Sequence, residues 1–146
     1  MARRVLAIVS VLYLVGLAII AFWPVPVDRE FSDALEVLIA QLQTDGLSFL
    51  SYSTVEIAAN VLLFVPLGIL LAVLFGEGAR WLAFGVCVAV SALIEFAQSV
   101  LLPDRFATAS DLLANVAGAA IGVLIVAIIS GVRNRRARRI GEVRAA

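Results

Sequence analysis

One carboxylate, Glu95, lies inside an otherwise apolar run from Trp81 to Leu102 that is long enough to cross a bilayer. An ionisable side chain at such a depth costs about 2.5–3.5 kcal/mol on insertion scales, so Glu95 is a candidate functional residue. Ser91 precedes it by four residues and Gln98 follows it by three, which puts all three side chains on one helical face. This face could support ligand binding, proton transfer or hydrogen bonding between helices.

Two further apolar runs carry polar side chains near one end. Asn60 lies close to the start of the run 57–75, and Asp111 and Asn115 lie around the start of the run 112–130. Asp111 also suits the ordinary capping of a helix N-terminus. Together with the face of Glu95 and an arginine in the preceding loop, these residues make up one candidate pocket. Its members are Asn60, Ser91, Glu95, Gln98, Arg105, Asp111 and Asn115.

Two glycines share a helical face with the polar residues of the run 112–130. Gly118 and Gly122 fall within the same narrow arc as Asp111 and Asn115 at 100° per residue. A pair of small residues four positions apart lets another helix backbone approach closely. We therefore predict that this arc faces the interior of the protein.

The run 57–75 contains a proline and a glycine near its middle. Pro66 lacks a backbone N–H and is predicted to kink its helix near the carbonyl of Leu62. Gly68 is interpreted as a packing residue.

Composition places the chain among membrane proteins. Hydrophobic residues make up 63% and charged residues 15%, against about 45–50% and 25% in soluble domains. Four runs have the length of about 20 residues that a bilayer requires; they predict spans at 5–23, 57–75, 81–102 and 112–130. We expect an all-α fold, an integral membrane four-helix bundle.

Because the chain lacks histidine, a nucleotide loop and a dedicated metal-ligand cluster, neither a metal nor a cofactor is expected.

The distribution of arginine predicts the orientation. Arg3 and Arg4 precede the first span, five arginines follow the last span within 133–139, and the loop 24–56 is mainly acidic. Cytoplasmic segments are enriched in arginine, so both termini are predicted to lie in the cytoplasm of a bacterial cell and the loop outside its inner membrane. The chain then divides into a first helix (1–24), an extracytoplasmic loop (25–55), a three-helix core (56–131) and a basic cytoplasmic tail (132–146).

The outer loop contains a helical pattern of its own. Its apolar residues recur at helical spacing: Phe31, Leu35, Leu38, Ile39 and Leu42. Asp33-x-x-Glu36 resembles a capping box, and Gly46 is a candidate stop. These features predict a short amphipathic helix on the outer membrane surface, either as a lid or as simple surface packing.

The order of these elements resembles the VanZ-like family of small bacterial membrane proteins. The matching elements are Asn60-x-x-x-Phe64-x-Pro66-x-Gly68, Ser91-x-x-x-Glu95-x-x-Gln98 and Arg105-x(5)-Asp111-x(3)-Asn115-x(2)-Gly118-x(3)-Gly122. The resemblance covers roughly residues 55–130 and implies a role in the cell envelope rather than a particular reaction. The family's namesake is linked to teicoplanin resistance, a property we do not carry over, and no catalytic residue transfers from the family.

Four functions remain open from the sequence. The first is an outward-facing pocket for a lipid-linked or cell-wall component, in which Glu95 and Asp111 bind amine, hydroxyl or proton-bearing groups and Arg105 pairs with a phosphate or carboxylate. The others are a hydrolase or transferase with paired carboxylates, a proton-coupled carrier that would require a homodimer, and an envelope assembly factor. Membrane lipids are the expected partners. Nucleic acid is not expected, because the basic tail is interpreted as a topology signal.

Overall fold

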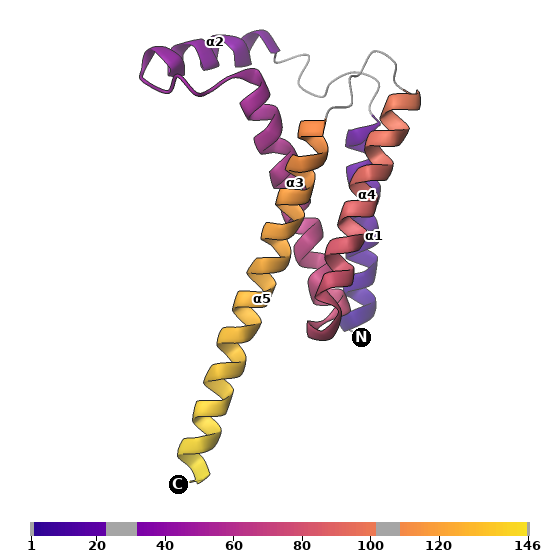
Figure 1. Cartoon of the computed structure of the whole chain (residues 1–146), viewed down its shortest axis with the longest axis vertical. Helices are drawn as coiled ribbons and strands as arrows, with labels where there is room; N and C mark the ends of the chain where they lie inside the picture. The colour runs from indigo at the N-terminus through magenta and orange to yellow at the C-terminus, as the bar shows by residue number, and fades with distance from the viewer. Residues whose placement is uncertain (1, 23–31, 102–108, 146) are drawn as a thin grey trace.

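The computed structural model describes residues 2–22, 32–101 and 109–145, which are mostly helical (Figure 1). The helices are α1 (Ala2–Ala21), α2 (Ser32–Thr44), α3 (Tyr52–Phe75), α4 (Arg80–Leu101) and α5 (Ala109–Ala145), with a 3-10 turn, η2, at Glu77–Ala79. The helices α1, α3, α4 and α5 are each long and apolar enough to cross a membrane. The predicted all-α fold with four membrane spans is therefore confirmed.

The spans are helical because a chain surrounded by lipid must satisfy its backbone hydrogen bonds within each segment. Their ends are marked by residues that suit helix termini. The Oγ of Ser51 accepts a hydrogen bond from the N–H of Thr54 at 3.2 Å and caps the start of α3. Gly76 ends α3 with a φ of 83°, and its N–H donates to the carbonyl of Ala72 at 3.1 Å. Between these residues α3 is helical through Pro66.

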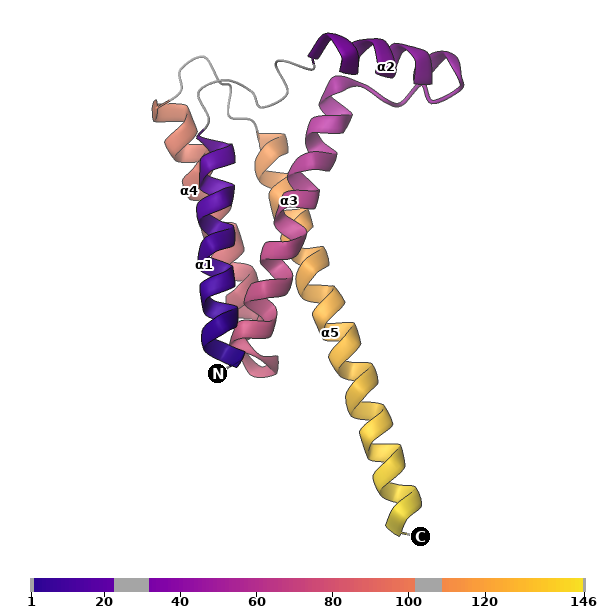
Figure 2. The same ribbon diagram turned by 180° about the vertical axis from the view of Figure 1, so that it is seen from behind.

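The spans lie side by side, but α5 diverges from the others along its second half (Figures 1 and 2). The start of α1 and the far end of α5 point to the same end of the molecule, which is also the end where η2 joins α3 to α4. We call this the η2 end. The opposite end carries α2, which runs crosswise to the spans, and we call it the α2 end.

The α2 helix occurs where the sequence predicts an amphipathic helix. It ends at Thr44, and Gly46, two residues later, has a φ of 101°, which confirms the predicted stop. The N–H of Gly46 donates to the carbonyl of Gln43 at 3.2 Å and the N–H of Leu47 to that of Leu42 at 3.0 Å, which is the Schellman pattern. The side chain of Asp33, assigned to the capping box, lies outside the described residues.

The segment predicted as a basic tail is a continuation of α5, which runs without a break from Ala109 to Ala145. With a rise of about 1.5 Å per residue, the 37 residues of α5 extend about 55 Å, well beyond the roughly 30 Å of a hydrocarbon core. The basic part therefore projects past the bundle at the η2 end (Figure 2). Its described arginines, at 133, 135, 136 and 138, are exposed.

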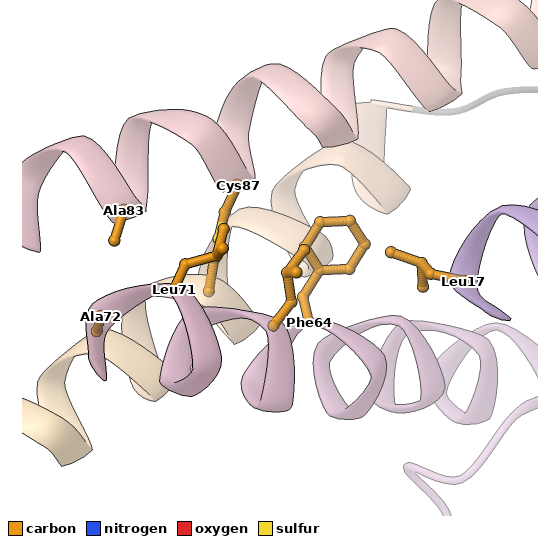
Figure 3. Close-up of a cluster of buried hydrophobic side chains, with 8 residues drawn as sticks. Leu17, Phe64, Leu71, Ala72, Ala83 and Cys87 are labelled. Atoms are coloured by element: carbon orange, nitrogen blue, oxygen red, sulfur yellow. The ribbon is translucent and has the colours of Figure 1, made fainter. Parts of the chain in front are cut away.

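An apolar core packs between α1, α3, α4 and α5 (Figure 3). Leu17 of α1 lies beside Phe64 of α3, while Ala83 and Cys87 of α4 lie over the second half of α3. Lipid is as apolar as these side chains, so close van der Waals packing, rather than exclusion from water, holds the helices together here. The buried cluster comprises Leu17, Phe64, Leu67, Leu71, Ala72, Ala83, Cys87 and Ala119.

The α3 and α5 helices approach each other most closely at glycines. A Cβ added to Gly118 of α5 would collide with the carbonyl oxygen of Val61, and one added to Gly122 would also strike the backbone of α3. In the reverse direction, a Cβ on Gly68 of α3 would lie 2.5 Å from the carbonyl oxygen of Ala119. Glycines on both helices therefore set the distance at which the polar groups of α3 and α5 meet.

Candidate functional site

The polar residues of the spans gather in the half of the bundle nearer the α2 end. Asn60 lies in the first half of α3, and Asp111 and Asn115 lie in the first turns of α5. Glu95 and Gln98 lie near the end of α4, which runs in the opposite direction. Three spans therefore deliver hydrogen-bonding side chains to this half of the bundle.

The first polar contact joins α3 to α5. Asn60 donates a hydrogen bond from Nδ2 to Oδ1 of Asp111 at 2.9 Å, and both side chains are half-buried. An ionised carboxylate can only accept hydrogen bonds, so the amide must present its NH₂ group to it. Asp111 also lies in the first turn of α5, where the helix dipole favours a negative charge.

A second contact, deeper in the bundle, joins α4 to α5. Asn115 donates from Nδ2 to Oγ of Ser91 at 3.0 Å, and these residues are only 5% and 0% exposed. The other amide atom, Oδ1 of Asn115, is buried and accepts no hydrogen bond. A buried acceptor left unsatisfied costs about 1–3 kcal/mol. Oδ1 of Asn115 is therefore a buried polar atom of the site that the described residues leave without a hydrogen bond.

Gln98 hydrogen-bonds to a different helix from the one that Ser91 contacts. Its Nε2 donates to the carbonyl oxygen of Ala21 at 2.8 Å, and Ala21 is the last residue of α1. Carbonyls in the last turn of a helix have no partner within the helix, so Gln98 satisfies one of them. Glu95 is half-buried on α4 between the levels of Ser91 and Gln98. The polar face of α4 thus reaches α5 at Ser91 and α1 at Gln98.

The remaining predicted residues either pack within a helix or lie outside the described residues. Pro66 is half-buried within α3, and Arg105 falls outside the described residues. The phenol of Tyr13 on α1 donates to the carbonyl of Leu63 on α3 at 2.7 Å, a contact that the sequence reasoning missed. A hydroxyl in the middle of the first span was the signal that could have revealed it.

The η2 end has a polar link that the sequence reasoning also missed. Arg80 and Glu77 form an ion pair at 3.3 Å, and Asn134 of α5 donates from Nδ2 to both carboxylate oxygens of Glu77 at 3.2 and 3.3 Å. This link ties the turn between α3 and α4 to the start of the basic part of α5.

In the part of the chain that the structure describes, no group of three or more His, Cys, Asp or Glu side chains could hold a metal ion.

Comparison with known families identifies the chain. The sequence model of the family described as VanZ/LLP1 matches residues 10–130, which is most of the protein. The chain belongs to the VanZ/LLP1 family. Searches among curated proteins and among solved structures gave no match.

The VanZ/LLP1 match confirms the predicted resemblance and extends it toward the N-terminus. The sequence motifs began near residue 55, whereas the matched region also includes α2 and the second half of α1. It contains every residue of the candidate pocket, and the basic part of α5 beyond residue 130 lies outside it. The polar contacts of α1, through Tyr13 and Ala21, thus belong to the VanZ/LLP1 region.

Proposed function

We propose that this VanZ/LLP1 protein is a membrane receptor that binds the headgroup of a lipid-linked envelope component. The observation that carries the proposal is Asn115, which is held in place by Ser91 and keeps a buried acceptor oxygen without a partner. Polar side chains that serve only to hold helices together pair with one another. An acceptor that the protein leaves unpaired, on a side chain that joins α4 to α5, supports a site completed by a bound group.

Two carboxylates on α4 and α5 also support a binding role. Glu95 lies one helical turn from Ser91 on α4, and Asp111 lies one turn from Asn115 on α5. Uncharged amides and hydroxyls are sufficient to join two helices, so ionisable acids inside spans more often mark functional sites. The two acids therefore lie on the two helices that the Ser91–Asn115 bond brings together.

The orientation that we propose places this site on the outer side of the bacterial inner membrane. The start of α1 and the end of α5 share the η2 end, and the described arginines of the spans and of the basic part of α5 lie there as well. Enrichment of arginine is typical of cytoplasmic segments. The α2 end, with its polar side chains, then faces the outside, where lipid-linked envelope precursors are used.

The test is binding of a polyprenyl-diphosphate-linked sugar to the full chain in lipid nanodiscs, measured by native mass spectrometry. Glu95→Gln keeps the shape of the side chain and removes its charge, so we expect a loss of binding of about tenfold or more with unchanged protein levels. The matched control is Glu77→Gln, the same substitution at the η2 end, which should bind as the wild type does.

Two results would contradict the receptor. Equal binding by wild-type, Glu95→Gln and Asp111→Asn proteins would show that the polar end takes no part in recognition. Chemical conversion of the precursor by the wild-type protein, lost in Glu95→Gln, would instead identify a membrane-embedded enzyme.

A further inference from the structure

The η2 end of the molecule has the features of a membrane surface. Trp81, in the first turn of α4, is 71% exposed, and exposed tryptophan is typical of the level where acyl chains meet headgroups. Glu77, one turn earlier, accepts hydrogen bonds from Nδ2 of Asn134 at 3.2 and 3.3 Å. Asn134 is therefore held at this level, and the part of α5 around it lies among the headgroups.

The surface of α5 changes from apolar to basic at the same level. Ile128, Ile129 and Val132 are exposed, which costs little in contact with acyl chains because lipid is as apolar as they are. Four exposed arginines follow, and we call them the arginine collar: Arg133, Arg135, Arg136 and Arg138. The order of apolar and then basic side chains along α5 matches the order of acyl chain and headgroup in a phospholipid.

The arginine collar surrounds its helix. At 3.6 residues per turn, Arg135, Arg136 and Arg138 lie about 200°, 300° and 140° around the axis from Arg133. The collar rises only about 7.5 Å from first to last residue, which is within the Debye length of about 8–10 Å. Because α5 projects past the bundle here (Figure 2), all four side chains can act on the same membrane surface.

The other charged side chains leave the η2 end positive. Arg3 and Arg4 are exposed at the start of α1, which lies at this end. Within the described residues, the acids at this end are Glu77 and Glu142, and Glu77 is already paired with Arg80 at 3.3 Å. A surface on which one sign of charge predominates attracts groups of the opposite charge.

We propose that the arginine collar binds the headgroups of anionic phospholipids in the leaflet from which α5 emerges. A guanidinium binds phosphate through two N–H donors at once, and about four to eight basic residues directly after a span favour anionic lipid. Headgroups surround a membrane helix on every side, as the arginines do, whereas a nucleic acid or a folded protein would cover one face. The collar lies at the opposite end of the bundle from the proposed receptor site, so the two proposals stand or fall separately.

The test measures which lipids the full chain retains in nanodiscs made of equal amounts of phosphatidylglycerol, which is anionic, and phosphatidylcholine, which is zwitterionic. Native mass spectrometry gives the ratio of the two lipids bound to the protein, and we expect phosphatidylglycerol to predominate. Replacing all four collar arginines with glutamine should lower this ratio about fivefold or more, because one arginine near an anionic surface contributes about fivefold. The direction of insertion does not matter, because both leaflets of the nanodisc have the same composition.

Replacing the same four arginines with lysine is the matched control, which keeps the positive charge and should keep most of the preference. Raising the ionic strength from about 0.1 M to 1 M shortens the Debye length from about 10 Å to 3 Å, so it should lower the ratio of the wild type and barely change that of the glutamine variant. If the glutamine variant fails to accumulate, Arg133→Gln combined with Arg135→Gln, nearest the bilayer, should still lower the ratio about twofold or more.

Equal ratios for the wild type and the glutamine variants would overturn the assignment of anionic lipid to the collar. A preference that high salt leaves unchanged would overturn it as well, because binding by exposed charges is screened. Binding of a short single-stranded RNA in nanodiscs of pure phosphatidylcholine, lost in the glutamine variant while the lipid ratio stays the same, would identify nucleic acid as the occupant instead. A ratio that falls in the glutamine variant and in high salt, and is kept in the lysine variant, would establish the collar as a site for anionic lipid.

Discussion

Single residues on α5 decide how closely the spans can pack. Gly118 lies where any Cβ would meet the carbonyl oxygen of Val61, and a backbone atom cannot move aside as a flexible side chain can. Gly85 of α4 differs, because a Cβ added there would enter open space with no other atom within 4 Å. The two positions therefore offer a clean contrast between a glycine required by packing and one that is not.

We expect Gly118→Leu to lower the free energy of unfolding by about 1–3 kcal/mol or more, because the overpacked side chain forces α3 and α5 apart. Gly85→Leu, which adds the same side chain toward lipid, should leave stability nearly unchanged. Thermal unfolding of the purified protein in detergent, with the amount of protein in the membrane, measures both variants. Equal stability of the two would show that α3 and α5 do not pack as closely as described.

The Asn60–Asp111 hydrogen bond is a second feature that can be tested at the residue scale. A double-mutant cycle with Asn60→Ala and Asp111→Ala should give a coupling free energy of about 0.6–1.7 kcal/mol, the range found for polar contacts between membrane helices. Unfolding by a denaturing detergent provides the four stabilities. The pair Asn60→Ala and Glu77→Ala, whose side chains lie at opposite ends of the bundle, should be additive and serves as the control.

At the scale of elements, α2 stands apart because it runs crosswise to the spans. Ile39 is buried, whereas Leu38 and Ala40 beside it are exposed. Leu38 belongs to the apolar stripe predicted from the sequence, and Ala40 lies on roughly the opposite face at 100° per residue. A helix at a membrane surface buries its apolar stripe about 5–10 Å into the boundary between headgroups and acyl chains.

A spin label at Leu38 should therefore be accessible to oxygen dissolved in the acyl chains, and a label at Ala40 should be accessible to a water-soluble nickel complex. Power-saturation measurements on the protein in vesicles compare the two positions directly. The same accessibility at both positions would mean that α2 does not lie on the membrane with its apolar stripe inward, and a role as a surface helix or lid would have to be abandoned.

At the scale of the whole molecule, the bundle is divided along its length. Apolar side chains such as Phe64, Leu71 and Cys87 fill it toward the η2 end, and polar contacts join three of its interfaces toward the α2 end. Such a division suits the receptor that we propose, whose binding site would lie in the polar half of the bundle. Which side of the membrane the polar half faces depends on the orientation of the chain.

Reporter fusions test that orientation. Fusions after Phe75 and after Ser130 should report the cytoplasm, and a fusion near Gly46 should report the outside, because the arginine-rich segments flank the η2 end. Two reporter enzymes are fused at each site, one active only in the cytoplasm and one active only outside, and they should give opposite signals. A tail that reports the outside would place the polar half of the bundle toward the cytoplasm and remove the basis for an envelope ligand.

The amino-acid sequence by itself determined the membrane class, the four spans, the α2 helix with its stop at Gly46, and the VanZ-like family. Each of these depends on local signals, because about 20 apolar residues span a bilayer and a glycine with positive φ ends a helix wherever it occurs. The sequence also indicated which polar residues share a face of their own helix, as Asp111 and Asn115 do on α5.

Only the tertiary structure decided which neighbour each polar residue meets. It paired Asn60 with Asp111 and Asn115 with Ser91, and it turned Gln98 toward the end of α1 instead of toward α5. It also showed that the basic tail continues α5 as a helix. Periodicity along one helix defines a direction around that helix, but the partner found in that direction depends on the order, tilt and separation of the other helices. Those quantities are set by packing between residues far apart in the chain, such as Gly118 against Val61.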